Sequence, residues 1–390
     1  MYTHKTRNML VVAGEASGDH HGALVVRELK SREPSLDICG IGGDELAGAG
    51  MNILFHCRDL SVLGFAEVFS RAAHILEAYL TIRKQFMEAP PDLIMLIDFP
   101  EFNLFVARLA RKHRVPVLYY ISPQIWAWRR GRAKKIARLV DKMAVVFPFE
   151  KTFYDRVGLD VEFVGHPLLD QTIERRPYDD ALRYLGLGES RPVIGLLPGS
   201  RYKEVSSLLP VMLDAALLIK KEFPGAQFVV PVAPGIDTAY VAGMKRTGFS
   251  FVHTPPGDFN QTLAVCDLVI VASGTATLQT ALMEKPMIIL YTVAALTYLL
   301  GRMLIKVPHI GLANIVAGKH IVPELIQSDV TPRRIAGEAA AILKNPQRLQ
   351  VMKNELAAVK HALGGRGASR RVAEIALEMM AATGGTPAAR

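Results

Sequence analysis

The sequence has few cysteines, and their placement excludes two kinds of stabilisation. The 390 residues include only Cys39, Cys57 and Cys266, which are far apart in the chain. An odd count argues against a disulfide framework, and no pair has the spacing of metal ligands. We therefore expect a reducing compartment. The apolar run at 9–13 is too short for the core of a signal peptide.

Long apolar runs are also scarce. The stretch 286–301 has sixteen residues without charge, whereas a membrane span needs about 20. It predicts peripheral contact with a membrane rather than a span. A second segment, 62–86, carries one helical face of apolar side chains at positions 65, 68, 69, 72, 76 and 79. That face indicates either a core helix buried on two sides or a patch that touches lipid.

Acidic residues are fewer than basic ones, and the formal net charge is +9. A basic protein meets nucleic acid, anionic lipid or phosphorylated substrates, and charge alone does not choose among them. Both tryptophans, Trp126 and Trp128, precede a run of six cations within residues 129–138. This segment predicts an interfacial anchor or an anion-binding surface, with a solvated helix face as the alternative.

Strand-like apolar runs alternate with helical patterns throughout the chain, which is typical of parallel α/β architecture. We expect strands near 9–13, 36–41, 93–98, 116–121, 143–147, 161–165, 193–197, 227–232, 250–253, 268–272 and 287–291. The polar stretch 170–191 separates the two sets. The pattern predicts two Rossmann-like doubly wound domains facing a cleft, 1–168 and 169–345, and C-terminal helices in 346–390 that pack back on an N-terminal domain, either their own or a partner's.

Two turns in the second half predict phosphate binding. Residues 198–201 read Pro-Gly-Ser-Arg between a buried strand and a helix, so free amides and the positive helix end would face an anion. Arg201 adds a planar cationic fork. The segment 273–277, Ser-Gly-Thr-Ala-Thr, opens the next such helix, although hydroxyls also cap helices without any ligand. Together the two turns favour a nucleotide diphosphate.

One carboxylate in the first half is a candidate general base. Asp98 ends the apolar run 92–98, where a strand's carboxyl end points into the ligand crevice. The alternative is an ordinary structural aspartate. Glu15 and Asp19 lie in the glycine loop 14–22, whose charge repels phosphate, so we expect them to bind sugar hydroxyls. We interpret His20 and His21 as helix-start residues rather than metal ligands.

The motifs together resemble the lipid-A-disaccharide synthase family, inverting glycosyltransferases with two Rossmann domains (the GT-B fold). The matching stretches run in order along nearly the whole chain: GEASGD at 14–19, IDFPEFN at 97–103, SPQIWAW at 122–128, GHP at 165–167, LPGSR at 197–201, SGTATL at 273–278, LANIVAG at 312–318 and PELIQ at 323–327. The combination is specific, whereas LPGSR alone would be a weak signal.

The resemblance implies a reaction and a set of residues. UDP-2,3-diacylglucosamine would donate its sugar to 2,3-diacylglucosamine 1-phosphate, giving the β-1,6-linked disaccharide 1-phosphate and UDP, with Asp98 as the general base. No metal or other cofactor is expected. The implied substrate-binding residues are Glu15, Ser17, Gly18, Asp19, Gln124, Trp126, His166, Ser200, Arg201, Ser273, Gly274, Thr275, Thr277, Gln279, Asn314 and Glu324.

One position departs from the pattern. Many enzymes of this fold place a glutamate after SGTATL to bind ribose hydroxyls, but here the residue is Gln279. Glu324 is the substitute we consider.

The partners implied are the two acylated sugars and an anionic membrane surface, met from the cytoplasmic side of the inner membrane. We expect no nucleic acid partner, and a homodimer stays open. The competing interpretations are another GT-B enzyme, such as a UDP-sugar 2-epimerase, and a non-catalytic nucleic-acid-binding protein that uses the 129–138 cluster. A dehydrogenase would need the dinucleotide fingerprint, which the sequence lacks.

Overall fold

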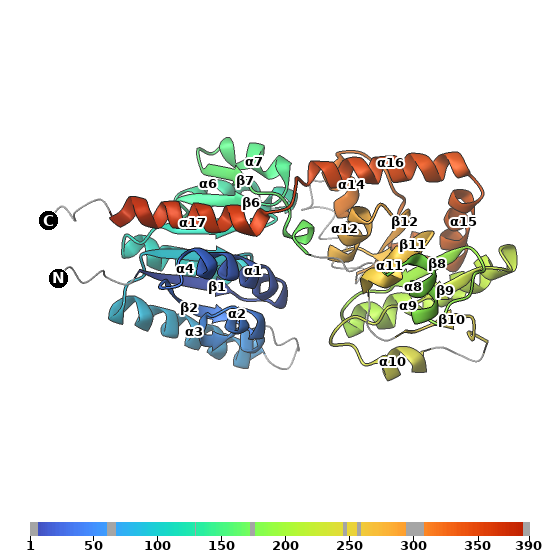
Figure 1. Ribbon diagram of the computed structural model, residues 1–390, viewed down its shortest axis with the longest axis horizontal. Coiled ribbons are helices and arrows are strands. Elements are labelled where there is room, and N and C mark those ends of the chain that lie inside the picture. The colour runs from blue at the N-terminus through green and yellow to red at the C-terminus, as the bar shows by residue number, and fades with distance from the viewer. Residues whose placement is uncertain are drawn as a thin grey trace. The chain divides into compact units, whose positions relative to one another are not determined.

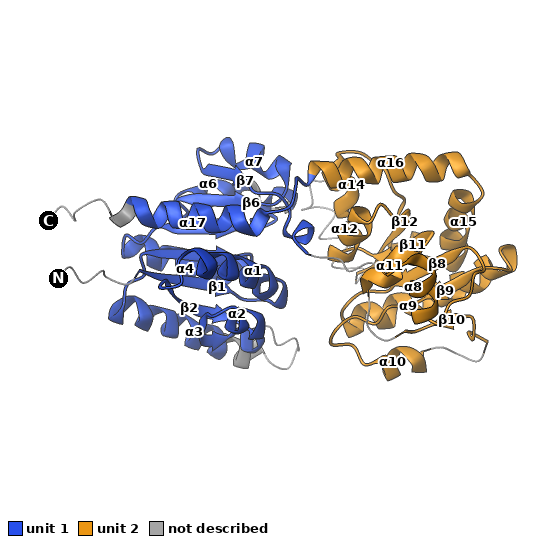
Figure 2. Cartoon of the chain, viewed as in Figure 1, with its two compact units in different colours: residues 1–171, 363–390 blue, residues 172–362 orange. Residues whose placement is uncertain are grey.

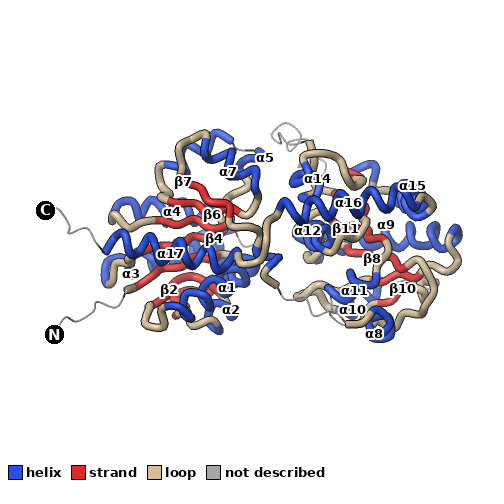
Figure 3. The backbone as a smooth tube through the Cα atoms, turned by 45° about the horizontal axis from the view of Figure 1, so that its top comes forward, coloured by secondary structure: helices blue, strands red, loops and turns tan. Residues whose placement is uncertain are grey.

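Two parallel sheets organise the computed structural model, which describes residues 7–60, 68–128, 130–171, 176–244, 248–255, 259–293 and 308–384. The chain divides into two compact units. Unit 1 combines 1–171 with 363–390, and unit 2 consists of 172–362 (Figure 2). Helices accompany the strands in both units, as expected for parallel pairing, because each strand must return to the same edge through a crossover (Figure 3).

Unit 1 is built on a seven-stranded sheet in the order β3-β2-β1-β4-β5-β6-β7 (Figure 1). Its strands are β1 (Asn8–Ala13), β2 (Asp37–Gly42), β3 (Asn52–His56), β4 (Leu93–Ile97), β5 (Val117–Tyr120), β6 (Lys142–Val145) and β7 (Asp160–Phe163). Its helices are α1 (Ala16–Arg32), α2 (Asp44–Gly48), α3 (Val68–Glu88), α4 (Pro100–Lys112), α5 (Ile125–Trp128), α6 (Ala133–Ala137), α7 (Pro148–Asp155) and α17 (Ala368–Gly384), with 3-10 turns η1 (Cys57–Leu60), η3 (Arg130–Arg132) and η4 (Pro167–Leu169).

Unit 2 is built on a six-stranded sheet in the order β10-β9-β8-β11-β12-β13. Its strands are β8 (Val193–Leu197), β9 (Gln227–Val229), β10 (Val252–His253), β11 (Leu268–Ala272), β12 (Met287–Tyr291) and β13 (Glu324–Ile326). Its helices are α8 (Tyr178–Tyr184), α9 (Tyr202–Glu222), α10 (Thr238–Gly243), α11 (Phe259–Val265), α12 (Thr275–Leu282), α14 (Leu312–Ala317), α15 (Pro332–Leu343) and α16 (Pro346–Ala362), with the turn η5 (Gln327–Asp329).

These two parallel α/β units confirm the predicted fold class. Each of the eleven predicted strands has a counterpart close to its expected position. The prediction missed β3, an edge strand whose residues are mostly half-buried, and the three-residue β13. Both pair in parallel with a strand that the sequence does reveal, β2 and β12 respectively. Short edge strands lack the continuous apolar run that marks a central strand.

The helix α3 turns a different face to the core than its sequence pattern suggests. Ala78, Ile82 and Phe86 are buried against the same face of the sheet as α4. Leu76, which we counted on the apolar face, is 57% exposed. The helix carries apolar residues on more than one side, so periodicity alone does not identify the buried side. The segment 61–67, and with it the start of the predicted helix, lies outside the described residues.

The predicted apolar run 286–301 is only partly described. Its first part is β12, and residues 294–307, including Arg302 and Lys306, lie outside the described residues. No helix within the described ranges is both long and apolar enough to span a bilayer.

The C-terminal helices belong to different units. We expected 346–390 as a whole to pack on an N-terminal domain, but α16 is part of unit 2, where it packs on α12 and α14. Only α17 joins unit 1, lying along α1 (Figure 1). The boundary falls at Leu363 because the sharp turns at Gly364 and Gly367, both with positive φ, end one helix and start the other.

One carboxylate caps the start of α17. Asp170 accepts hydrogen bonds from the backbone N–H groups of Gly367, Ala368 and Ser369, at 2.6, 3.2 and 2.8 Å. These amides at the start of the helix have no partner within the helix itself. The two segments that link the units are therefore tied together within unit 1.

Candidate active site

The carboxyl edge of the unit 1 sheet gathers the candidate base and its neighbours. Ala13 of β1 pairs with Ile97 of β4, and Ile97 pairs with Tyr120 of β5, so the loops that follow these strands leave the sheet side by side. Asp98 is the first residue after β4. The structure thus brings Asp98 and the loop beginning at Gly14 to the same edge.

The backbone at Asp98 is held in an uncommon conformation. Asp98 and Phe99 have φ of 45° and 44°, in the left-handed region that non-glycine residues seldom adopt. Asp98 donates its N–H to the Tyr120 carbonyl at 3.1 Å. Its own carbonyl accepts from the Tyr119 hydroxyl at 2.5 Å and from Asn103 Nδ2 at 2.7 Å. These bonds fix the backbone of the turn.

The surroundings of Asp98 favour proton uptake near neutral pH. Burial and the negative charge of Glu15 raise the pKa of the Asp98 carboxyl to about 6, although a hydrogen bond from the Phe99 amide opposes the shift. A carboxylate with such a pKa is a suitable general base at neutral pH, because it is mostly ionised yet binds a proton readily.

The helix α1 begins at Ala16, so of the ligands expected in a glycine loop 14–22 only Glu15 precedes the helix, and Ser17, Gly18 and Asp19 lie in its first turn. Glu15 and Ser17 are exposed, whereas Gly18 packs against Ala13 and Ile97. Gly14 must be glycine, because a Cβ there would lie 2.2 Å from the Phe99 ring.

Asp19 has a structural task instead of the sugar contact that we expected. It is buried, and its carboxylate accepts the N–H groups of Gly43, Glu45 and Leu46 at 2.6, 3.1 and 3.2 Å. Those amides lie at the start of α2, so Asp19 acts as a helix cap from outside the helix. A sugar hydroxyl would have to compete with three backbone donors.

The segment 122–128 also differs from expectation. Trp126, which we expected to meet a substrate or a lipid headgroup, is buried and donates its indole N–H to Glu150 at 3.0 Å. Its ring meets Phe149 edge-on at 4.9 Å between centroids. Gln124 in the same segment is exposed. The side chains of Trp128, Arg129 and Arg130 lie outside the described residues.

His166 is likewise enclosed. Its Nδ1 accepts the backbone N–H of Leu168 at 3.2 Å, and burial lowers the pKa of its imidazole to about 3, with the neighbouring His21 contributing. A neutral ring that already accepts a bond from its own turn supports the chain rather than an anion. This replaces the ligand contact that we expected for His166.

In unit 2 the two predicted phosphate loops follow neighbouring strands. Leu197 of β8 pairs with Val271 of β11, so 198–201 and 273–274 leave the sheet side by side. α9 and α12 begin directly after them. Both loops contain a glycine with positive φ, Gly199 at 119° and Gly274 at 154°. The predicted pairing of two helix starts is present in the structure.

Glu204 of α9 binds the groups of the first loop, 198–201. Glu204 Oε2 accepts the N–H groups of Ser200 and Arg201 at 3.0 and 3.3 Å, and Glu204 Oε1 pairs with the Arg201 guanidinium at 3.1 Å. The Arg201 side chain is otherwise 69% exposed. The anion-binding groups that we expected are therefore present, but a carboxylate of the chain itself holds them.

The second loop is more open. Gly274 and Thr275 are exposed, and Ser273 and Gln279 are partly exposed. Thr277 is buried, and its hydroxyl bonds back to the Gly274 carbonyl at 2.7 Å, so it caps the turn. The Ser273 hydroxyl donates to the Ile310 carbonyl at 3.4 Å.

Asn314, which is buried, and Glu324, which is partly exposed, bind each other and the backbone around α14. Asn314 binds Glu324 and the backbone of Val322 through Nδ2, and its Oδ1 accepts the N–H groups of Ile321 and Val322. Glu324 accepts the N–H groups of Ile310 and Gly311 at 3.0 and 2.9 Å. The ribose contact that we considered for Glu324 would have to share these oxygens, so its observed role is to hold the start of α14.

Three residues of these sites escaped the sequence analysis. Tyr119 is inside an apolar strand, and nothing in its neighbourhood marks its hydroxyl as a partner of Asp98. Glu204 is three residues after Arg201, which precedes α9, and Glu150 is three residues after Phe147, which precedes α7. This is the spacing of a capping box. That spacing predicts the helix starts but not the further contacts that the two carboxylates make.

Comparison with known proteins shows a family match over nearly the whole chain. The model of the family described as lipid-A-disaccharide synthetase matches residues 9–379. A lipid-A-disaccharide synthase of Geobacter sulfurreducens is 46% identical over 380 residues, covering 97% of this chain and 99% of the relative. Among solved structures, a UDP-GlcNAc 2-epimerase of Neisseria meningitidis bound to UDP-GlcNAc is similar with a TM-score of 0.64 at 13% identity, covering 95% of this chain and 100% of its own.

The glycosyltransferase of kitacinnamycin is similar with a TM-score of 0.62 at 14% identity, covering 96% of this chain and 98% of its own. At such identities these structures show the fold alone, which is that of GT-B glycosyltransferases and their relatives. The sequence match shows the family as well as the fold, because it extends over both units at 46% identity. The chain belongs to the lipid-A-disaccharide synthase family of glycosyltransferases.

Proposed function

We propose that this chain transfers the sugar of UDP-2,3-diacylglucosamine to the 6-hydroxyl of 2,3-diacylglucosamine 1-phosphate, with inversion at the anomeric carbon. Asp98 takes the proton of the hydroxyl, the oxygen forms its bond to the anomeric carbon, and the bond from that carbon to the diphosphate breaks. The products are the β-1,6-linked disaccharide 1-phosphate and UDP. The place of Asp98 at the carboxyl edge of the sheet carries the assignment of the base, and burial and the charge of Glu15 support it by raising the pKa of Asp98 to about 6.

The leaving diphosphate is assigned to unit 2. Amides at the starts of α9 and α12 and the Arg201 guanidinium are suited to the negative charge that develops on UDP. Because Glu204 holds two of these amides and Arg201, the proposal requires the diphosphate to displace its carboxylate. The diphosphate carries more negative charge than one carboxylate, which favours it in this exchange.

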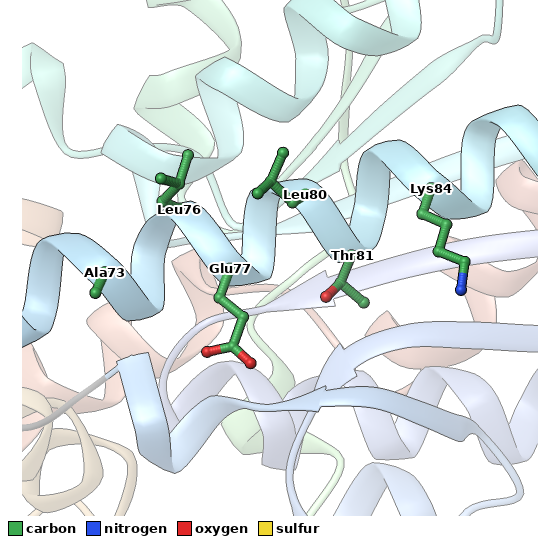
Figure 4. Close-up of a pocket in the computed structure, with 6 residues that line it drawn as sticks. All are labelled: Ala73, Leu76, Glu77, Leu80, Thr81 and Lys84. Atoms are coloured by element: carbon green, nitrogen blue, oxygen red, sulfur yellow. The ribbon is translucent and has the colours of Figure 1, made fainter.

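A membrane surface is the place where acylated substrates are met. Leu76 and Leu80 stand one turn apart on the same side of α3 (Figure 4), 57% and 47% exposed. They line a shallow hollow of about 390 Å³, which Glu77 and Lys84 also line, one with each sign of charge. A neighbouring hollow of about 540 Å³ is lined by Arg83, Met87, Arg108 and Lys112 among others. We propose that this cationic and apolar surface contacts anionic lipid on the cytoplasmic side of the inner membrane.

The transfer reaction itself tests the proposed function. The purified chain, given both acylated sugars in detergent micelles, should form one disaccharide 1-phosphate for each UDP released. The linkage and the inverted configuration are read by NMR of the product. Turnover of UDP-GlcNAc without any acyl group, or epimerisation at C2, would contradict the proposal.

Asp98→Asn should abolish transfer while leaving UDP affinity unchanged, because UDP is assigned to unit 2. Asparagine tolerates the left-handed backbone at this position, so the fold is kept. In the wild type, kcat/KM should fall as the pH drops through about 6, where the base becomes protonated. The rate falls toward low pH because only the ionised carboxylate accepts a proton from the hydroxyl.

A second variant tests the cause of the raised pKa, and a third is its control. Glu15→Gln removes the like charge, so the acid midpoint should move down while burial keeps the pKa above its ordinary value. Asp92→Asn changes a carboxylate at the opposite end of β4, where it accepts the Asn8 N–H at 2.9 Å, and should leave the midpoint in place. An unchanged midpoint in Glu15→Gln would remove Glu15 from the surroundings of the base.

Arg201→Ala should weaken UDP binding about tenfold or more in calorimetry, the scale of a lost charge-assisted hydrogen bond. Glu204→Gln should tighten it by about 1 kcal/mol, roughly fivefold in Kd, because a competing charge is removed. Arg183→Ala is the matched control, an exposed arginine paired with Asp180 three residues away in the same unit. Equal affinities of all three variants would place the diphosphate elsewhere.

The membrane contact is tested by flotation with lipid vesicles. The wild type should bind vesicles rich in phosphatidylglycerol and bind pure phosphatidylcholine weakly, because the surface is cationic. The double variant Leu76→Ser, Leu80→Ser should lose most of this binding without loss of folding, since both side chains are exposed. Val351→Ser, an apolar residue of α16 that is 53% exposed, should bind like the wild type. Full binding by the double variant would exclude this face.

A further inference from the structure

A buried carboxylate of unit 1 binds the segment that follows β5 and has no part in the chemistry described above. Glu150 of α7 is 1% exposed. Its Oε1 accepts the hydroxyl of Ser122 at 2.5 Å and the indole N–H of Trp126 at 3.0 Å, and its Oε2 accepts the N–H of Phe147 at 3.1 Å. A buried carboxylate is tolerated only with such partners. Two of the three belong to the segment 122–128 that follows β5.

The chain is strained where this segment begins. Ile121 has φ of 61°, a left-handed conformation that is a strong outlier for a β-branched residue. Conformations of this kind persist only where the surrounding contacts determine them fully. The N–H of Ile121 donates to the Ala144 carbonyl at 3.1 Å, and the next side chain, Ser122, is the one that Glu150 accepts. We call the turn at Ile121 and Ser122 the corner. Glu150 thus holds the corner through the Ser122 hydroxyl.

The same corner is joined to the backbone of Asp98. The Tyr120 carbonyl, immediately before Ile121, accepts the Asp98 N–H, and the Tyr119 hydroxyl donates to the Asp98 carbonyl. A second residue of α7, Tyr154, donates its hydroxyl to the Pro123 carbonyl at 3.4 Å. The segment from Tyr119 to Trp126 is therefore bound to the base at one end and to α7 at the other.

We propose that Glu150 is a positioning residue for the transfer reaction: it holds the segment 122–126 so that Asp98 and the exposed Gln124 keep the geometry that the reaction needs. It touches neither substrate, and its effect passes through Ser122 and Trp126. The inference rests on the proposed function, because it assigns Glu150 to the geometry of that reaction. Small displacements of a base cost far more in rate than in binding.

The charge state of Glu150 supports the geometry. Burial raises the pKa of its carboxyl to about 7, and the hydrogen bonds from Ser122, Phe147 and Trp126 work against that shift. Tyr154 of the same helix is the titratable group that interacts with it, and burial raises the pKa of Tyr154, so its hydroxyl stays protonated. At pH 8 the carboxylate is therefore ionised and accepts all three donors.

The test compares Glu150→Gln and Trp126→Phe with the wild type in the transfer assay at pH 8. Glutamine keeps the shape of the side chain but turns an N–H toward a donor, and phenylalanine keeps a buried ring but lacks the N–H. Both variants should lower kcat, Glu150→Gln by at least about tenfold, while KM for the UDP-sugar changes by less than about twofold. The UDP-sugar is assigned to unit 2, which these changes leave intact.

Asp141→Asn is the matched control. Asp141 accepts the Val117 N–H at 2.8 Å at the opposite end of the same strand β5, so the variant makes the same chemical change away from the corner. Its kcat should stay within about twofold of the wild type. Circular dichroism at the assay temperature verifies that each variant is folded. If Glu150→Gln does not fold, Trp126→Phe alone decides the question.

A folded variant with a lower melting temperature and an unchanged kcat would overturn the proposal, because that is the result of a purely structural role. A kcat loss of equal size in Asp141→Asn would overturn it as well. If the wild type itself catalyses no transfer, the proposed function fails first, and the inference falls with it.

Discussion

The helices that follow parallel strands begin with backbone N–H groups that need partners, and this constraint shapes both units. A parallel sheet sends each strand into a loop at the same edge, and the helices that follow begin with unpaired amides. This chain satisfies many of them with its own carboxylates. The residues that do so are Asp19, Glu150, Asp170, Glu204 and Glu324.

Asp98 combines two features: a raised pKa, which Glu150 shares, and a left-handed backbone, which none of these five carboxylates has. Burial and the charge of Glu15 outweigh the hydrogen bond from the Phe99 amide, so the pKa of Asp98 rises. Raising a pKa costs folding free energy at neutral pH, because the ionised form is the less favoured one in the folded state. The left-handed backbone at Asp98 adds strain to this cost. Both features are those of a residue kept for its chemistry rather than for stability.

The fold was largely predictable because its signal is local. Buried strands such as β4 and β8 are continuous apolar runs, and the loops after them follow directly in the sequence. The candidate site was predictable in place but not in detail. Asp19 and Trp126 have the residue types of ligand contacts, yet both are buried by segments that are distant in the sequence. Which carboxylate a backbone amide meets depends on the tertiary fold, and a linear pattern does not record it.

The position of α17 bears on how the protein is made. Unit 2 is one continuous segment, whereas unit 1 is completed by a helix that is synthesised after unit 2. Val372, Ala373 and Ala376 of α17 are fully buried, so the hydrophobic surface that they cover in unit 1 stays open until that helix leaves the ribosome. Domains otherwise fold in the order of their synthesis. In this chain the second unit is free to finish first, and the nascent first unit is the part that a chaperone would meet.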